Sequence, residues 1–252
     1  AAILEASHFV EFWDEAFKGE LCFEHGIAAV PPLAFGKKKD VAALSVIEAA
    51  VRAALADGKF VVTLGGEHSI SAAPIRAHFE KYPNMSVLHF DAHSDLRAEY
   101  LGNPYSHASA LARVMDFLPG ERLVQVGIRA QCIEEYRTIQ ERGIRTFFAC
   151  DLHAGAHGKN WQRTVADALG DEVYITFDVD YFDPSIMPAT GTPEPGGFLW
   201  DETIALLKLV GAKKRIVGFD VVELAPMRAL PFPTFLTAKL VYKMMNAAFM
   251  GR

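Results

Sequence analysis

The sequence predicts an α/β protein in which helices cover both faces of a mainly parallel sheet. Short apolar runs alternate with longer helix-like runs along the whole chain of 252 residues. Hydrophobic residues make up 51% of the chain, which is enough for a large buried core. Neither a short repeat nor a low-complexity linker interrupts the alternation, so we expect one domain over residues 1–252.

The predicted strands are the short apolar runs. In chain order they span residues 21–30, 60–64, 86–90, 123–128, 144–149, 173–177 and 215–219. The first of these runs is interrupted by Glu24 and His25, and Pro31 breaks the pattern after it. The other runs alternate with helix-like segments, which implies a mainly parallel sheet.

The predicted helices lie between the strands. They span residues 1–17, 41–56, 69–81, 107–117, 133–141, 159–169, 201–210 and 234–248. Asp40 is placed to cap the second of these helices, and Pro74 suits the first turns of the third. Two long loops remain, over residues 91–106 and 178–200. In a parallel sheet, loops beyond the carboxyl ends of the strands form the ligand site.

Composition excludes several classes of function. The net charge of −6 does not suit a nucleic-acid-binding protein, because such proteins are usually basic. The three cysteines, Cys22, Cys132 and Cys150, are too few and too far apart for a disulfide framework or a thiolate zinc site. We expect reduced cysteines and a cytoplasmic location. The sequence shows neither a membrane span nor a signal peptide, but it lacks an initiator Met, which leaves open whether residues precede Ala1.

The strand over residues 86–90 is followed by three potential metal ligands at alternating positions. These are Asp91, His93 and Asp95. Side chains at i, i+2 and i+4 of an extended chain point to the same side, so the three can converge as the strand ends. Asp178 and Asp180 repeat the pattern after the strand over residues 173–177, with Asp183 three residues later.

Together with a histidine that follows the strand over residues 60–64, these side chains form an oxygen-rich ligand set. The candidate metal ligands are His68, Asp91, His93, Asp95, Asp178 and Asp180. The set disfavours a structural zinc site and suits two divalent ions such as Mn²⁺. Two such ions can hold a water, lower its pKa and supply hydroxide. The alternative, that these acids only cap strands, is weakened because three separate strands end in this way.

The motifs that carry these ligands resemble those of the ureohydrolase family, which contains arginase, agmatinase, guanidinobutyrase and formiminoglutamase. The motifs are Gly65-Gly66-Glu67-His68-Ser69, Phe90-Asp91-Ala92-His93-Ser94-Asp95 and Phe177-Asp178-Val179-Asp180-Tyr181-Phe182-Asp183-Pro184. The resemblance extends from about Ile3 to the last predicted helix.

The family resemblance implies a three-layer αβα sandwich with a mainly parallel sheet of about eight strands, the arginase/deacetylase-like fold. Seven strands are predicted here, and family members normally have one more before the region of Ile3, so we expect that strand to be missing from this chain. A homo-oligomer, trimer or hexamer, is also implied.

The resemblance also implies how two Mn²⁺ ions are shared among the ligands. One ion would be bound by His68, Asp91, Asp95 and Asp178. The other would be bound by His93, Asp91, Asp178 and Asp180. Asp91 and Asp178 would therefore bridge the two ions.

Three residues are implied to be catalytic. Asp95 would take a proton from the attacking water, His107 would protonate the leaving amine, and Glu223 would orient the guanidinium group. Without the family, His107 would be interpreted as a surface or capping histidine and Glu223 as a buried or capping carboxylate. The loop over residues 190–197 is expected to line the pocket, and Asp220 is expected to be structural.

The implied reaction is hydrolysis of a small guanidino compound to urea and an amine, with agmatine giving putrescine as the first choice. Arg97 stands where arginases carry an Asn that helps to hold the substrate carboxylate. The nearby Glu99 suits a cationic amine, whereas Arg97 could select an acid such as guanidinobutyrate. Arginase and formiminoglutamase specificities also stay open. A different class, a non-catalytic relative that only binds metal, is disfavoured because every implied ligand is present.

Overall fold

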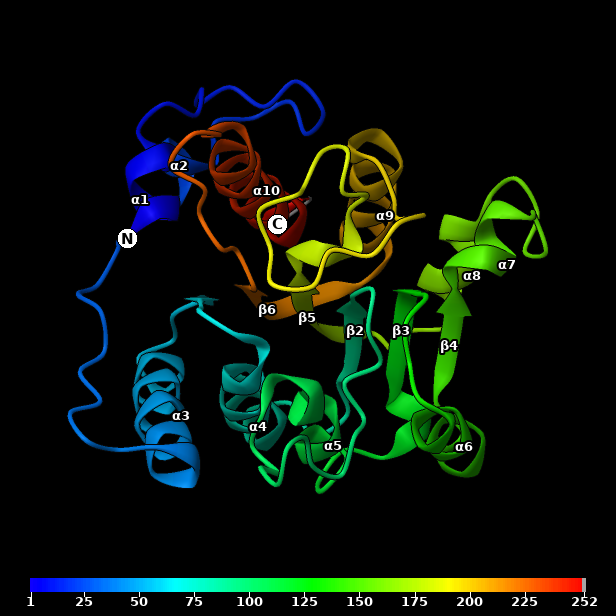
Figure 1. The fold of residues 1–252 in the computed structure, drawn as a ribbon. Helices are drawn as coiled ribbons and strands as arrows, with labels where there is room; N and C mark the ends of the chain where they lie inside the picture. The colour runs from blue at the N-terminus through cyan, green and yellow to red at the C-terminus, as the bar shows by residue number, and fades with distance from the viewer. Residues whose placement is uncertain (251–252) are drawn as a thin grey trace.

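The centre of the protein is a parallel sheet. The structure, a computed structural model, describes residues 1–250, and within them the sheet has six strands in the order β1-β6-β5-β2-β3-β4 (Figure 1). The strands are β1 (Val61–Leu64), β2 (Ser86–Phe90), β3 (Leu123–Ile128), β4 (Arg145–Phe148), β5 (Glu172–Asp178) and β6 (Arg215–Val222). Every neighbouring pair is parallel.

Helices cover the sheet on both faces (Figure 1). On one face lie α3 (Asp40–Ala56), α4 (Ala72–Lys81), α5 (Ala110–Val114) and α6 (Ile133–Arg142). On the other lie α1 (Ala2–Ser7), α2 (Leu21–Glu24), α7 (Ala149–His153), α8 (Trp161–Asp167), α9 (Trp200–Lys213) and α10 (Phe232–Phe249). Four short 3₁₀ helices, η1 (His68–Ser71), η2 (His107–Ser109), η3 (Gly120–Arg122) and η4 (Val179–Tyr181), lie in the connections.

Alternation along the central strands builds one core on each face of the sheet, and a third, smaller core lies between α3 and α4. In β2, Val87 packs in the core with α4 and α5, and the next residue, Leu88, packs in the core with α8, α9 and α10. In β5, Tyr174 packs in the same core as Val87, and Ile175 packs in the same core as Leu88. Successive side chains of a strand point to opposite faces, so strands that are apolar throughout require helices on both sides. The predicted three-layer αβα architecture is therefore confirmed.

Six of the seven predicted strands are confirmed, but the first one is wrong. Residues 21–24 form the short helix α2, and the chain from residue 26 to residue 35 is irregular. The charged Glu24 and His25 interrupt this apolar run, and Pro31 cannot donate a backbone hydrogen bond. The described sheet consequently has six strands instead of the seven predicted or the eight implied by the family.

Two predictions about helix ends also need correction. The helix predicted over residues 1–17 ends at Ser7. Farther along, the side chain of Asp14 accepts hydrogen bonds from the backbone N–H groups of Ala16 and Phe17 and stabilises a turn in place of the predicted helix. Asp40 does not cap α3: it is the first residue of that helix, and the preceding Lys39 is its N-cap. Pro74 is the third residue of α4, as predicted.

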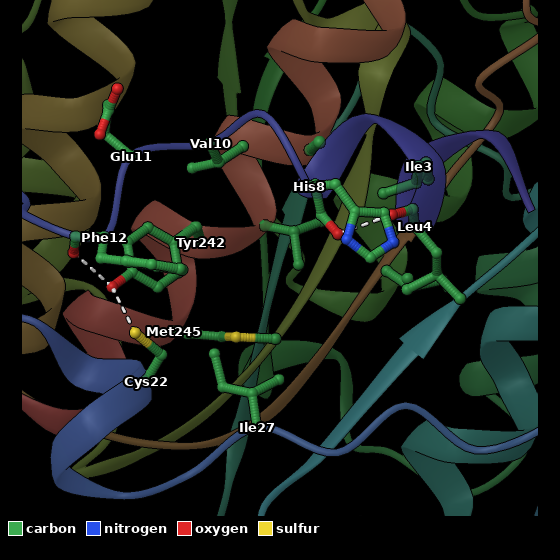
Figure 2. Close-up of a pocket in the computed structure, with 14 residues that line it drawn as sticks. Ile3, Leu4, His8, Val10, Glu11, Phe12, Cys22, Ile27, Tyr242 and Met245 are labelled. Carbon is green, nitrogen blue, oxygen red and sulfur yellow. Dashed lines mark hydrogen bonds between the residues drawn. The ribbon is translucent and has the colours of Figure 1, made fainter.

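An apolar cavity of about 320 Å³ lies between α1 and α10 (Figure 2). Its walls include Ile3, Val10, Val241 and Met245, and none of the six candidate metal ligands lines it. The cavity therefore does not belong to the predicted metal site. Among the helices of residues 1–250, none has the length and apolar character needed to cross a lipid bilayer.

Candidate metal centre

The order of the strands brings the candidate ligands together at one edge of the sheet. Phe90 and Phe177 are paired in the register of β2 and β5. Asp91 and Asp178, the residues that directly follow them, therefore lie side by side. On the other side of β5 lies β6, which ends just before Glu223, and β1 comes next, before the segment that carries His68. The site thus spans four neighbouring strands, β1, β6, β5 and β2.

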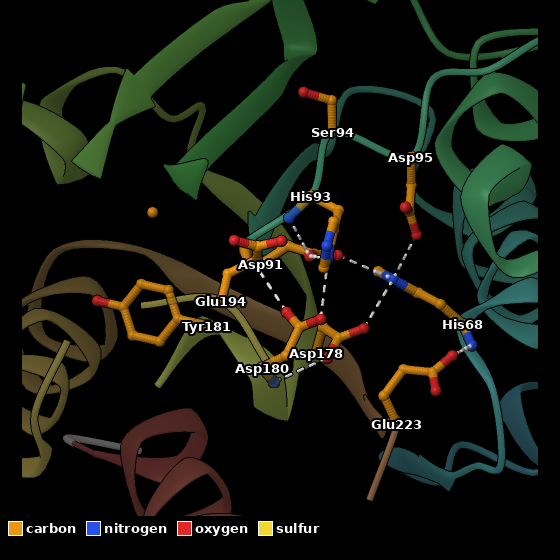
Figure 3. A network of polar contacts seen from close by, with 12 residues as sticks. His68, Asp91, His93, Ser94, Asp95, Asp178, Asp180, Tyr181, Glu194 and Glu223 are labelled. Carbon is orange, nitrogen blue, oxygen red and sulfur yellow. Dashed lines mark hydrogen bonds and ion pairs between the residues drawn. The ribbon is translucent and has the colours of Figure 1, made fainter. Parts of the chain in front are cut away.

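One group of ligands surrounds the imidazole of His68 (Figure 3). Its Nδ1 atom lies 2.9 Å from Asp95 Oδ2, 3.0 Å from Asp91 Oδ2 and 3.4 Å from Asp178 Oδ2. His68 is fully buried, and its Nδ1 atom has no hydrogen-bond partner. Burial lowers the pKa of His68, but contacts with the three carboxylates outweigh it and raise that pKa, so the group attracts positive charge, which a proton or a divalent ion can supply.

A second group surrounds His93. Its Nδ1 atom lies 2.9 Å from Asp180 Oδ2 and 3.5 Å from Asp91 Oδ1. Asp91 therefore contributes one oxygen to each group, as a bridging carboxylate would. The structure thus brings all six predicted ligands close together. Asp91 contacts both histidines, whereas Asp178 contacts His68 and Asp180, so its bridging role stays a prediction. Which ion each side chain binds stays a prediction.

Backbone N–H groups hold the carboxylates in place. Ala92 N–H donates to Asp180 Oδ1 at 3.0 Å, and Asp180 N–H donates to Asp178 Oδ1 at 2.8 Å. Asp95 has a positive φ of 53°, and its carbonyl accepts hydrogen bonds from Leu111 and Ala112 at the start of α5. These contacts position Asp95, Asp178 and Asp180 before any ion binds.

Burial and the contacts among the ligands together set the pKa values of the cluster. Burial raises the pKa of Asp95 to about 7 and that of Asp180 to about 6, and repulsion from Asp91 adds to both shifts. Burial lowers the pKa of His93, but hydrogen bonds to Asp180 and Asp91 outweigh it and raise that pKa to about 11. Burial and the neighbouring acids also raise the pKa of Asp178. Four carboxylates this close together need positive charge, which the oxygen-rich donor set would take from divalent ions.

Glu223 lies beside the cluster, directly after β6. Its Oε1 accepts the backbone N–H of His68 at 2.6 Å, and its own N–H donates to Gly66 O at 2.8 Å. Burial raises the pKa of Glu223. Its positive φ of 63° turns the chain at the strand end. The carboxylate that is predicted to orient the substrate therefore lies next to a predicted metal ligand.

His107 lies at the rim and does not contact the ligands. Its Nδ1 atom is 3.4 Å from Glu67 Oε2, and both side chains are about half exposed (45% and 58%). Its ring also lies 5.6 Å from that of Tyr100. Asp183 is directed away from the cluster and accepts backbone N–H groups of Ser185, Gly196 and Gly197, which shape the loop that follows.

Sequence reasoning missed Arg129, which holds the segment that carries Asp180. Its guanidinium donates to the carbonyl of Asp180 at 2.7 Å, to that of Glu194 at 3.0 Å and to that of Tyr181 at 3.3 Å. Its place directly after β3, at the same sheet edge as the ligands, was the available signal.

His89 is a second buried residue that supports the site. Its Nε2 lies 2.8 Å from Asp91 Oδ2, and its Nδ1 lies 3.0 Å from Gln125 Nε2. His89 is close enough to His68 and Asp91 to form a metal-like group, but both its nitrogens already have partners. We therefore assign it to holding Asp91 and not to binding an ion.

Comparisons with known proteins agree with this geometry. The model of the arginase family matches residues 1–247. The N(1)-aminopropylagmatine ureohydrolase of Synechocystis sp. is 37% identical over 251 residues, which cover 97% of this chain and 80% of that protein. The agmatinase of Bacillus subtilis is 32% identical over 219 residues, covering 86% of this chain and 73% of that protein.

A solved structure shows the same architecture. The agmatine ureohydrolase of Thermoplasma volcanium superimposes with a TM-score of 0.85 at 31% sequence identity, over 98% of this chain and 81% of that one. The family match spans nearly the whole chain, including the strands and loops that carry the ligand cluster. The chain therefore belongs to the arginase family.

Proposed function

We propose that this protein hydrolyses a guanidinium group to urea and a primary amine, with two divalent ions, preferably Mn²⁺, as cofactors. The observation that carries the proposal is the pair of ligand groups joined by Asp91. Two divalent ions, when bound there, would lower the pKa of a water and supply hydroxide.

Three side chains would carry out the proton transfers and orient the substrate. Asp95 lies within the His68 group and would accept a proton from the attacking water. Glu223 Oε1 is held by the backbone of His68, which leaves Oε2 to accept N–H groups of the guanidinium. His107 stands at the rim, where it would return a proton to the leaving amine.

The surroundings of Arg97 favour a substrate with a cationic tail. Arg97 Nε lies 3.9 Å from Glu135 Oε2, and its guanidinium lies over the ring of Tyr100 at 5.6 Å. The Glu135 carboxylate is almost fully buried and gives Arg97 an acidic partner within the protein. Arg97 is therefore poorly placed to select a substrate acid.

We propose agmatine as the first substrate, giving putrescine. The exposed Glu67 carboxylate at the rim would favour its free ammonium end. The aminopropyl derivative of agmatine is a second candidate, because a relative named for that compound is 37% identical over nearly the whole chain. Both compounds present the same guanidinium end to the metal centre.

The test is urea release by the Mn²⁺-loaded protein from agmatine, aminopropylagmatine, arginine, guanidinobutyrate and formiminoglutamate. We expect the first two to be turned over fastest. Faster turnover of guanidinobutyrate would overturn the substrate class. Metal binding without urea from any of these compounds would support a non-catalytic relative instead.

A variant series ties the reaction to the metal centre. His93→Ala and Asp178→Ala should each lose bound metal and urea release together, because each removes a cluster ligand. Asp171→Ala, at an exposed aspartate outside the cluster, serves as the control. Full activity after chelation would contradict the proposal.

Three further expectations stay proposals. We propose that the chain forms one domain, works as a homo-oligomer, trimer or hexamer, and is located in the cytoplasm. Cys22, Cys132 and Cys150 are all free thiols in the structure, which supports a reducing compartment. Light scattering after size exclusion would measure the oligomeric state.

A further inference from the structure

A chain of buried hydrogen bonds leads away from the metal-facing side of His68. His68 Nε2 lies 3.0 Å from Thr176 Oγ1, and the hydroxyl of Thr176 donates to Asp220 Oδ1 at 2.7 Å. All three side chains are fully buried. Thr176 and Asp220 are paired in the register of β5 and β6, so the chain runs across two central strands.

The direction of each hydrogen bond follows from the donors available. Asp220 accepts two more hydroxyls, from Ser71 at 2.9 Å and from Tyr174 at 2.8 Å. A threonine hydroxyl carries a single proton, and here that proton goes to Asp220. Thr176 can then only accept from the imidazole, so His68 must carry its proton on Nε2. The Nδ1 atom of a neutral His68 is left with a lone pair, pointing at the carboxylates of the cluster.

This choice of nitrogen matters for metal binding. Three carboxylate oxygens lie within 3.4 Å of Nδ1 and would by themselves favour a proton there. A proton on Nδ1 competes directly with a metal ion for the same lone pair. An acceptor on the opposite side of the ring opposes that outcome, because it stabilises the proton on Nε2.

We propose that Asp220, acting through Thr176, is a positioning residue that fixes the tautomer and orientation of His68 for metal binding. The inference rests on the proposed metal centre and assigns a role to a carboxylate that the sequence indicated as structural. β6 then holds His68 twice, by its backbone through Glu223 and by its ring through Asp220. The ion in the His68 group depends on this chain of contacts, whereas the ion in the His93 group does not.

The alternative is that Asp220 only joins β5, β6 and η1. That role predicts a loss of folding stability with no change at the imidazole. The two roles are separated by Thr176→Val, which removes the hydroxyl at nearly constant volume, and Thr176→Ser, which keeps it. Tyr174→Phe is the matched control, because it removes another hydroxyl from Asp220 without touching His68.

The first measurement is the tautomer of His68 in the metal-free protein, by ¹⁵N NMR of labelled histidine. We expect a proton on Nε2 in the wild type, Thr176→Ser and Tyr174→Phe, whether or not the neighbouring acids also hold a proton on Nδ1. In Thr176→Val and Asp220→Ala, which remove the acceptor chain, the single proton of the neutral ring should shift toward Nδ1. A neutral wild-type His68 with its only proton on Nδ1 would overturn the proposal, and this result does not depend on any variant folding.

The second measurement is titration with Mn²⁺ alone. Thr176→Val should weaken one of the two ions by about 10- to 100-fold, a usual effect of losing an outer contact to a metal ligand. In Thr176→Val, the affinity for the other ion should stay close to the wild-type value. In Thr176→Ser and Tyr174→Phe, both affinities should stay close to the wild-type values. Unchanged affinity for both ions in Thr176→Val, with only a lower Tm, would establish the purely structural role, and a wild type that binds no Mn²⁺ would also end the proposal. A wild type that binds two ions but releases no urea would refute the proposed reaction and leave this positioning role standing.

Discussion

Gly127 is a residue on which the shape of the metal site depends. It has a φ of +97°, and a Cβ atom built there would lie 2.5 Å from the ring of Tyr181 and 3.0 Å from the carbonyl of Asp91. Tyr181 directly follows Asp180 and stacks on Phe198 with ring centres 4.9 Å apart. Any side chain at residue 127 must therefore push against a segment that carries metal ligands.

We predict that Gly127→Ala lowers the free energy of unfolding by about 2–4 kcal/mol, through overpacking and backbone strain, and also weakens Mn²⁺ binding. Chemical denaturation and metal titration measure the two effects. Gly155→Ala is the control, because Gly155 has a similar φ of +75° with no atom near its Cβ position. Equal losses in the two variants would mean that strain alone matters at Gly127.

His78 is a buried histidine outside the metal site. Its Nδ1–H donates to Pro74 O at 2.7 Å, while Nε2 faces Gly218 and has no hydrogen-bond partner. Burial lowers the pKa of His78 to about 4. The unfolded chain, with a pKa of about 6.5, therefore binds this proton first as the pH falls.

We predict that His78 contributes stability that is present above pH 6.5 and is lost as the pH falls toward 4, by up to about 3 kcal/mol. His78→Gln cannot titrate, so its unfolding free energy should change less between these pH values. Denaturation curves across this range measure the difference, with the exposed His8→Gln as control. Parallel pH profiles for His78→Gln and wild type would contradict the prediction.

The candidate metal ligands could be proposed from the sequence at residue scale because their signal is local. Asp91, His93 and Asp95 follow a strand at alternating positions, and alternation can be observed in one segment. The contact between Thr176 and Asp220 could not be predicted from a local pattern. Their contact depends on the register between β5 and β6, strands that are far apart in the chain.

At the scale of elements, the N-terminal segment is fastened to α10 by a buried ion pair. Lys243 Nζ lies 2.6 Å from Asp14 Oδ1, and both side chains are only about 2% exposed. Asn246 also donates to Asp14, at 3.1 Å. Removing one member of such a pair leaves the other charge buried without its partner.

We predict that Lys243→Met lowers the free energy of unfolding by about 3–5 kcal/mol and that combining it with Asp14→Leu recovers part of the loss. A double-mutant cycle in urea measures the coupling. Lys213→Met is the matched control, because Lys213 pairs with Asp167 at the same 2.6 Å distance but at the surface, where the effect should be small. Additive effects in the cycle would rule out the coupling.

The same ion pair explains where element prediction failed. The six confirmed strands could be predicted because βα alternation is repeated along the chain. Residues 1–30 have no such repeated pattern. Their path is set by contacts of Asp14 with Lys243 and Asn246, more than two hundred positions away, which no local pattern encodes.

At the scale of the whole molecule, the metal centre places several ionisable groups in the interior and so couples folding to pH. The pKa of Asp95 is raised to about 7 and that of Asp180 to about 6, both above the usual carboxyl value. The pKa of His93 is raised to about 11. Without metal, the folded protein keeps these protons at pH values where the unfolded chain has lost them.

We therefore predict that the metal-free protein becomes less stable as the pH rises from 6.5 to 8, because the folded state binds more protons than the unfolded state in this window. The lowered pKa of Asp91 acts in the opposite sense only below its usual value near 4, and the lowered pKa values of His78 and His89 offset part of the loss just above pH 6.5. Mn²⁺ should replace the bound protons, so it should raise the Tm more at pH 8 than at pH 6.5 and release protons on binding. Thermal unfolding with chelator or with Mn²⁺, and proton release in weak buffer, measure these effects. A Tm of the chelated protein that stays constant or increases between pH 6.5 and 8 would show that the cluster does not hold these protons.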